Sequence, residues 1–131
     1  MRAPFIDHLT LPVRDLEASK RFYEAALAPF GGTVHEEPGP PDGWGPAVAF
    51  GPPGSEDFAI APGEPAASMH IAFLAPDRAT VDAFHAAALA AGGTDNGAPG
   101  LRPQYHAGYY GAYVLDPDGH NVEAVFHDKP G

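Results

Sequence analysis

The chain has 131 residues and a formal net charge of −10 at pH 7, with seven Lys and Arg against seventeen Asp and Glu. An acidic surface repels phosphate backbones, which argues against nucleic-acid binding, and no apolar run approaches the ~20 residues that a membrane span requires. There are no cysteines, which excludes disulfides and thiolate metal sites. The sequence shows no secretory signal, so we expect a cytoplasmic protein.

The sequence contains an internal repeat with a spacing of 62 residues. His8 recurs as His70 (70 − 8 = 62), and Asp15 recurs as Asp77. Two further pairs share the same spacing: Phe22 with Phe84, and Leu27 with Leu89. A constant spacing over separate features predicts two copies of one structural unit, which would place equivalent side chains about a common axis.

The first copy predicts the element order β-α-β-β-β. Residues 5–13 alternate with period two, and Asp15 supplies an N-cap for a helix that Gly31-Gly32 end. Three short segments between Pro/Gly-rich turns predict strands: Thr33–Glu37, Ala47–Gly51 and Asp57–Ala61.

The second copy repeats this order. Met69–Ala75 predicts a strand, Asp77 begins a helix, and Gly92-Gly93 end it. Three more strands are expected, one near Gly93–Ala98 and two in a hairpin: Tyr109–Leu115 and His120–His127. The fold class is therefore α+β, a single domain over 1–131 with one module at about 4–62 and another at about 68–128. A module of roughly 60 residues is marginal alone, so the two must pack on each other or on a second chain.

Three side chains on the predicted strands suit a metal site. His8 and His70 lie on the strand faces opposite the apolar residues that cover the helices, and Glu123 does the same on the last strand. A buried carboxylate is costly unless it faces a cation or is hydrogen-bonded. Two imidazoles and one carboxylate fit a divalent metal (Zn, Ni, Mn or Fe), although Glu123 could instead be a satisfied structural group.

The loop after the sixth strand is the densest polar and aromatic stretch in the chain. We assign possible catalytic roles to His106 and Tyr110, and substrate-binding roles to Arg102, Tyr105 and Tyr109. A surface loop with aromatic packing explains the same residues equally well. Trp44, in a separate Pro/Gly-rich loop, is either a lid that contacts substrate or a dimer contact.

Three stretches of the chain resemble the vicinal oxygen chelate superfamily, which includes glyoxalase I, fosfomycin-resistance proteins, bleomycin-resistance proteins and extradiol dioxygenases. They are HLTLPVRDLEASKRFYEAAL, MHIAFLAPDRATVDAFHAAALAAGG and YYGAYVLDPDGHNVEAV. The resemblance implies paired βαβββ modules whose curved mixed sheets form a cupped site. It also implies a metal held on the first strand of each module and the last strand of the second, and a homodimer whose subunits often complete each other's sites.

The sequence departs from the glyoxalase I pattern at one position. Members of that group carry a fourth ligand, usually glutamate, on the last strand of the first module, where this chain has Ala59 or Ile60. We therefore expect a metal-dependent enzyme acting on a small oxygen-rich molecule, by lyase, isomerase or dioxygenase chemistry, that is not a standard glyoxalase I. The alternative is a metal-free protein that binds a small molecule or drug, similar to the bleomycin-resistance proteins.

Overall fold

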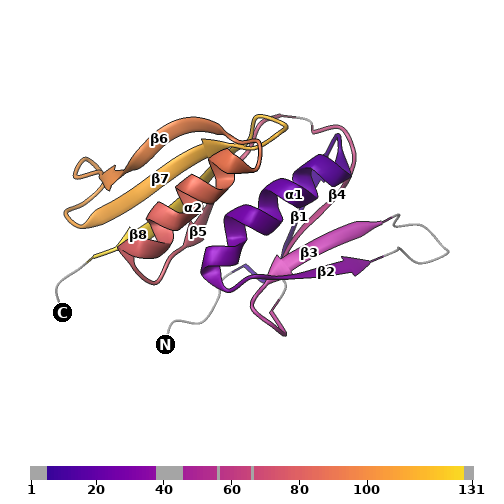
Figure 1. The fold of residues 1–131 in the computed structure, drawn as a ribbon, viewed down its shortest axis with the longest axis horizontal. Coiled ribbons are helices and arrows are strands. Elements are labelled where there is room, and N and C mark those ends of the chain that lie inside the picture. Colours follow the sequence, from indigo (N-terminus) through magenta and orange to yellow (C-terminus); the bar gives the residue numbers. More distant parts are fainter. Residues whose placement is uncertain (1–5, 38–45, 56, 66, 129–131) are drawn as a thin grey trace.

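The computed structural model describes residues 6–37, 46–55, 57–65 and 67–128. The first module contains β1 (Leu9–Val13), α1 (Leu16–Leu27), a 3₁₀ turn (Ala28–Phe30), β2 (Thr33–Glu37), β3 (Ala47–Gly51) and β4 (Phe58–Pro62). The second contains β5 (His70–Leu74), α2 (Arg78–Ala90), β6 (Thr94–Leu101), β7 (Tyr109–Leu115) and β8 (Asn121–His127). The predicted β-α-β-β-β order is therefore confirmed in both halves (Figure 1).

The two modules have the same sheet topology. One sheet has the strand order β1-β4-β3-β2, and the other has the order β5-β8-β7-β6. In each sheet the first strand pairs in parallel with the last, and the other neighbours are antiparallel. The molecule is an α+β fold of two open mixed sheets, and the shared topology accounts for the repeat in the sequence.

Both helices begin as the sequence predicts. The Asp15 side chain accepts a hydrogen bond from the Ala18 amide at 3.1 Å, and Asp77 accepts one from the Thr80 amide at 2.8 Å. Each bond satisfies one of the amides that the first helical turn leaves without a partner. After α1 the chain makes the 3₁₀ turn before Gly31, whose positive φ of 78° closes the segment.

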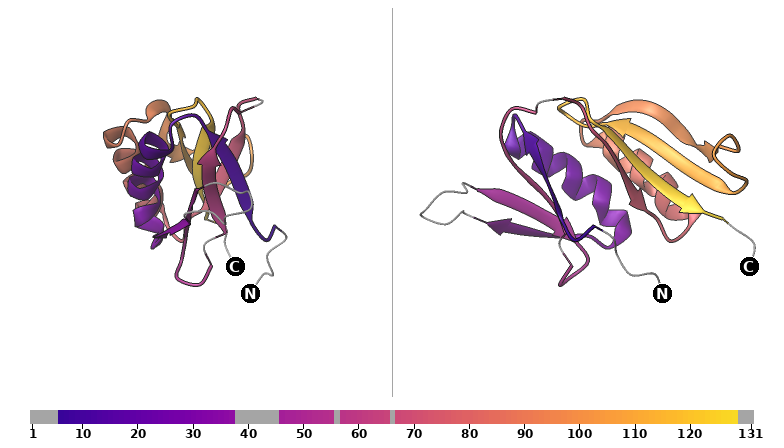
Figure 2. Two further views of the ribbon diagram at one scale, coloured as in Figure 1. Left: turned by 90° about the vertical axis from the view of Figure 1, so that its right-hand side faces the viewer. Right: turned by 180° about the vertical axis from the view of Figure 1, so that it is seen from behind.

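The helices lie side by side on one face of the molecule and cover the apolar faces of both sheets (Figure 2). Phe22 and Phe84, one from each helix, are fully buried over these sheets. Aromatic side chains also join the modules, since the Phe58 and Phe73 rings lie 5.2 Å apart edge to face. The two halves therefore pack on each other within one chain, as a marginal module requires.

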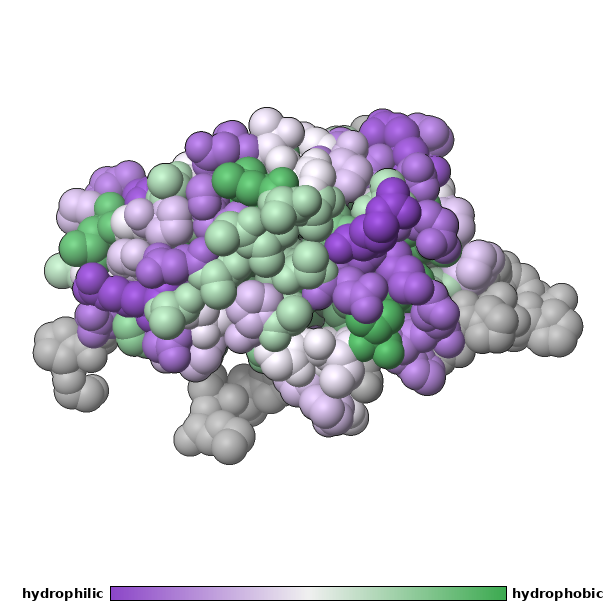
Figure 3. Space-filling view, in the orientation of Figure 1, coloured by the Kyte–Doolittle hydropathy of each residue, from purple (hydrophilic) through white to green (hydrophobic). Residues whose placement is uncertain are grey.

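The helix side of the molecule is weakly apolar. Figure 3 shows a pale green band that follows α2, with hydrophilic residues on both sides of it. Four of the exposed positions of α2 are alanines: Ala79, Ala83, Ala86 and Ala90. Neither helix, with 12 and 13 residues, is long enough to cross a membrane.

The opposite face of the sheets is open in this chain. On β5 the side chains of His70, Ala72 and Leu74 are exposed, Leu74 to 71%. The intervening residues Ile71 and Phe73 turn toward the helices and pack on the core. The open face thus carries the residues that the alternation of each strand directs away from the helices.

Candidate functional site

A buried carboxylate lies at the centre of the open face of the second sheet. Glu123 is on β8 and is only 1% exposed, and its Cα faces Ala72 on β5 and Tyr113 on β7. One carboxylate oxygen, Oε1, lies 2.7 Å from the Nε2 atom of His70, and the other accepts a hydrogen bond from the Tyr109 hydroxyl. The strand alternation therefore directs Glu123 as predicted, and both of its oxygens have a polar partner.

Tyr109 remains a hydrogen-bond donor to this carboxylate at ordinary pH. Burial, followed by the hydrogen bond to Glu123, raises the pKa of the Tyr109 hydroxyl above its usual value. Burial raises the pKa of the neighbouring Tyr113 as well. Tyr113 was missed by the sequence analysis, although it follows Tyr109 by four residues and period two therefore places both on one face.

His8 and His70 line the same groove. The groove lies between the modules, has a volume of about 480 Å³, and is walled mainly by the starts of β1 and β5. His8 is 72% exposed and its Nδ1 atom lies 2.8 Å from a carboxylate oxygen of Asp7. Among the residues that the structure describes, His8, His70 and Glu123 do not form a group with ligand atoms within 4.8 Å of one another. The structure thus pairs His70 with Glu123 and places His8 on the groove that His70 also lines.

Other predicted residues surround Tyr109 on the same face. The Tyr105 ring lies 4.8 Å from the Tyr109 ring, and the Arg102 guanidinium lies 5.4 Å from the centre of the Tyr113 ring. The His106 ring is 5.4 Å from the Tyr109 ring, and its Nε2 atom lies 2.9 Å from Nδ1 of His127. These side chains form an aromatic and basic wall beside Glu123.

Tyr110 does not join this wall. The Tyr110 hydroxyl donates to Asp82 on α2 at 2.6 Å, and Arg78 lies over the Tyr110 ring at 4.8 Å. Tyr110 therefore occupies the helix side of β7, because adjacent residues of a strand point to opposite faces. Trp44 lies outside the described residues.

The strand register locates the position equivalent to Glu123 in the first module. In the second sheet Ala72 faces Glu123, and in the first sheet Thr10, which matches Ala72 in the repeat, faces Ala59. The equivalent position is therefore Ala59, and it carries no carboxylate. This chain differs here from proteins with a ligand on that strand.

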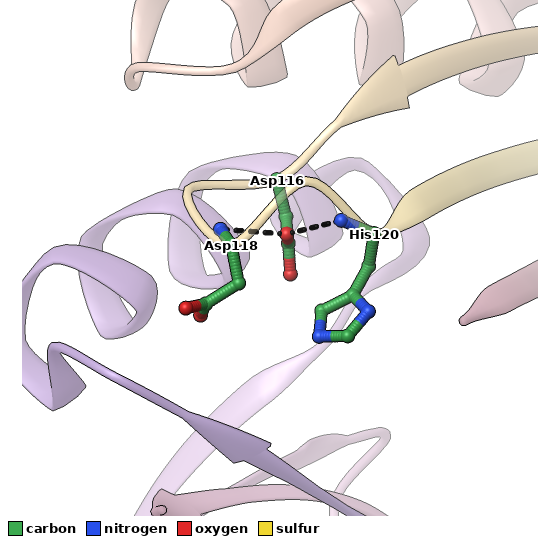
Figure 4. Close-up of side chains that lie close together, drawn as sticks. All are labelled: Asp116, Asp118 and His120. Carbon is green, nitrogen blue, oxygen red and sulfur yellow. Dashed lines mark hydrogen bonds between the residues drawn. The ribbon is translucent and has the colours of Figure 1, made fainter. Parts of the chain in front are cut away.

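A second cluster with metal-binding residue types lies in the turn between β7 and β8. Asp116, Asp118 and His120 offer ligand atoms within 4.8 Å of one another (Figure 4). One oxygen of Asp116 accepts the amides of Asp118 and His120, and the other accepts the hydroxyl of the buried Tyr23 at 2.6 Å. The Asp118 carboxylate is paired with Arg14 at 3.1 Å.

The histidine of this turn is in the wrong tautomer for a metal. The Met69 amide donates to Nδ1 of His120 at 2.8 Å, so a neutral ring carries its proton on Nε2 and has no second lone pair to offer. His120 is fully buried, and its Nε2 atom has no hydrogen-bond partner among the described residues. We therefore interpret this turn as a lock that holds the second module to Tyr23 on α1 and to Arg14 of the first module.

Comparisons with known proteins agree with this fold. The model of the Glyoxalase/Bleomycin resistance protein/Dioxygenase superfamily matches residues 5–124. A glyoxalase/bleomycin resistance protein from Albidiferax ferrireducens is 32% identical, with a TM-score of 0.73, over 97% of this chain and 100% of that one. The chain belongs to this superfamily.

Two solved structures with lower sequence identity share the fold alone. A lactoylglutathione lyase from Agrobacterium tumefaciens is 22% identical over 95% of both chains, with a TM-score of 0.64. An antibiotic binding protein from Streptomyces is also 22% identical, over 98% of this chain and 99% of that one, with a TM-score of 0.65. No match was found among curated proteins. The same fold therefore occurs in a protein named as a lyase and in a protein named as an antibiotic binder, each 22% identical to this chain.

Proposed function

We propose that this protein is a metal-dependent enzyme that acts on a small oxygen-rich molecule. In this proposal His70 and Glu123 hold a divalent metal, and His8 completes the ligand set. The observation that carries the proposal is the contact between a nearly inaccessible carboxylate and an imidazole on the open face of a sheet, at 2.7 Å. Such a pair suits Zn, Ni, Mn or Fe, and one side of it remains open to solvent for substrate.

The donor atoms fit a metal with a small displacement. Metal–nitrogen and metal–oxygen bonds of ~2.0–2.2 Å at a tetrahedral angle separate the two donors by roughly 3.3 Å. The Nε2 and Oε1 atoms of His70 and Glu123 therefore need to separate by about 0.6 Å from their 2.7 Å contact. The Tyr109 hydroxyl holds the second carboxylate oxygen in place during this change.

The third ligand requires either a movement of His8 or a second copy of the chain. His8 lies at the groove and is bound to the exposed Asp7, so a rotation toward His70 disrupts only a surface contact. In a homodimer, the first module of one copy could instead face the second module of the other and so bring the His8 of one copy to the His70 and Glu123 of the other. The exposed apolar side chain of Leu74 on the open face favours such a dimer.

A bound metal would supply Lewis acidity to a pair of vicinal substrate oxygens. The residues of this chain would position the substrate. Tyr109 keeps its proton and orients Glu123, while Tyr105 and Arg102 line the wall where an aromatic or anionic group of the substrate would lie. His106 stays a candidate acid or base at the edge of this wall. Because Ala59 provides no second carboxylate for proton transfer, the proposed chemistry is that of a lyase, isomerase or dioxygenase other than a standard glyoxalase I.

A second candidate function is metal-free binding of a small molecule or drug. It is favoured by the direct bonds of Glu123 to His70 and Tyr109, which satisfy the carboxylate without a cation. The aromatic wall and the net charge of −10 would suit a planar, cationic compound.

Metal analysis separates the two functions. Untagged protein purified without chelators is analysed for bound Zn, Ni, Mn and Fe, and metal affinity is compared among wild type, His70→Ala and Glu123→Gln. The enzyme proposal expects both variants to lose more than about 100-fold in affinity, since even outer contacts of a metal site contribute 10–100-fold. His85→Gln is the matched control, because His85 also contacts a carboxylate, that of Asp95, but does so from α2. Equal metal affinity in all four proteins would refute the metal assignment, and intact ligand binding by metal-free protein would support the second function.

A further inference from the structure

We propose that His106 and His127 form a second transition-metal site, separate from His70 and Glu123, which binds Ni²⁺, Cu²⁺ or Zn²⁺. His106 lies in the loop between β6 and β7, and His127 is the last residue of β8. Nε2 of His106 is 2.9 Å from Nδ1 of His127, and the two ring centroids are 5.1 Å apart. The distance between the ring centroids is close to the nitrogen–nitrogen distance plus the distance from each nitrogen to the centre of its own ring. The two nitrogens therefore face each other along the line that joins the rings.

The hydrogen bonds fix which atom of His106 is available to a metal. Its Nδ1 atom lies 2.8 Å from the carbonyl oxygen of Ala107. A carbonyl only accepts, so Nδ1 carries the ring proton and Nε2 presents its lone pair to His127. A donated bond from the remote ring nitrogen to a backbone carbonyl is the usual support of a metal-binding histidine.

A metal can replace the proton that the two rings share. The Nδ1–H of His127 donates to Nε2 of His106 in this structure. Metal binding would require the tautomer in which His127 carries its proton on Nε2, so that its Nδ1 lone pair faces the metal. Two metal–nitrogen bonds of ~2.0–2.1 Å require a nitrogen separation of roughly 3.3 Å, about 0.4 Å more than the present contact. The net charge of the protein is unchanged by this step.

The position of the site separates it from the first one. His127 and Glu123 are four residues apart on the same face of β8, which is about 13 Å along a strand. Tyr109 lies between them, with its hydroxyl on Glu123 and its ring edge-on to both histidines at 5.4 Å. The two sites share a neighbouring tyrosine but no ligand.

The chemistry of the site selects the metal class. An all-imidazole pair favours Ni²⁺, Cu²⁺ and Zn²⁺, whereas Mg²⁺ and Ca²⁺ require oxygen ligands. His127 is exposed and His106 is half-buried, so water molecules can complete the coordination. The acidic net charge of the chain increases the local concentration of divalent cations.

The test uses protein in which the first site is disabled. Untagged His70→Ala/Glu123→Gln protein, checked for folding by circular dichroism, is titrated with Ni²⁺ in a calorimeter. We expect one Ni²⁺ per chain in this background, and a loss of at least about tenfold in affinity when His106→Ala or His127→Ala is added. Addition of His85→Gln is expected to leave the affinity unchanged.

Two results would overturn the proposal: no saturable Ni²⁺ binding in the double variant, or binding that His127→Ala does not weaken. If the double variant does not fold, imidazole nitrogen NMR of wild-type protein decides the question, because Zn²⁺ must shift the resonances of both His106 and His127. The outcome is independent of the proposed function. If wild type and the double variant bind the same number of Ni²⁺ ions per chain, the proposal of a metal at His70 and Glu123 is refuted, whereas the proposal of a site at His106 and His127 is unaffected.

Discussion

The hydroxyl of Tyr23 provides a sharp test of how the two modules are held together. It belongs to α1 of the first module and donates at 2.6 Å to Asp116, in the β7–β8 turn of the second. Tyr23 is fully buried and Asp116 is 5% exposed. Tyr23→Phe removes only this donor, since the ring keeps its edge contacts with Phe22 and Phe58.

The expected cost follows from the charge of the acceptor. A hydrogen bond to a charged group contributes about 1.5–3 kcal/mol, and a buried carboxylate oxygen that loses its donor also keeps its desolvation penalty. Tyr110→Phe is the matched control, because the Tyr110 hydroxyl donates to Asp82 at the same distance of 2.6 Å but at an exposed position. Water can replace that bond, so we expect a cost below ~1 kcal/mol.

Urea unfolding followed by circular dichroism measures both costs. Tyr23→Phe should lower the free energy of unfolding by about 2 kcal/mol, with a lower midpoint and an unchanged m-value. If the two variants differ by less than about 0.5 kcal/mol, the turn does not act as a buried lock between the modules, and the interpretation of Asp116 is wrong.

Three further results are expected. Burial and the Asp116 carboxylate raise the pKa of Tyr23 above its unfolded value of ~10. The protonated hydroxyl therefore stabilises the folded chain fully below pH ~10, and this contribution is lost as the pH rises further. The alkaline loss of folding stability should be smaller in Tyr23→Phe than in wild type. In a tyrosinate absorbance titration, Tyr23 and Tyr109 should ionise only when the chain unfolds, and ionisation of all five tyrosines by pH 11 in folded protein would contradict this. Gly93→Ala places a Cβ 2.4 Å from a side-chain carbon of Val114 and should destabilise the fold by at least about 2 kcal/mol in thermal unfolding. Gly32→Ala is the milder comparison, because its nearest contact is 3.0 Å. Equal melting temperatures of the two variants would count against this packing.

Local patterns predicted the elements and their faces. The aspartates before each helix cap it, and the alternation of the last strand directs Glu123 away from the helices because successive strand residues must point to opposite sides. The same rule separates Tyr109 from Tyr110, and it could have excluded Tyr110 from the wall beside Glu123. Tyr113 could have been included by the same reasoning.

Local sequence patterns did not predict which side chains from different elements are in contact. Nothing local indicates that Asp116 receives the Tyr23 hydroxyl from the other module, or that His106 meets His127 from the far end of another strand. The placement of His8 is of the same kind, since the repeat predicts its strand and face but not its distance from His70.

The sequence by itself determined the duplication, the order of the elements and the face that each strand turns toward solvent, because periodicity and capping act within a few residues. The tertiary structure alone decided which side chains from separate elements come within bonding distance. Those distances depend on how the two sheets pack around Phe58 and Phe73, and on the conformations of the loops between strands. The register of the strands likewise decided that Ala59 occupies the position equivalent to Glu123, because pairing across a sheet is a property of two segments and not of one.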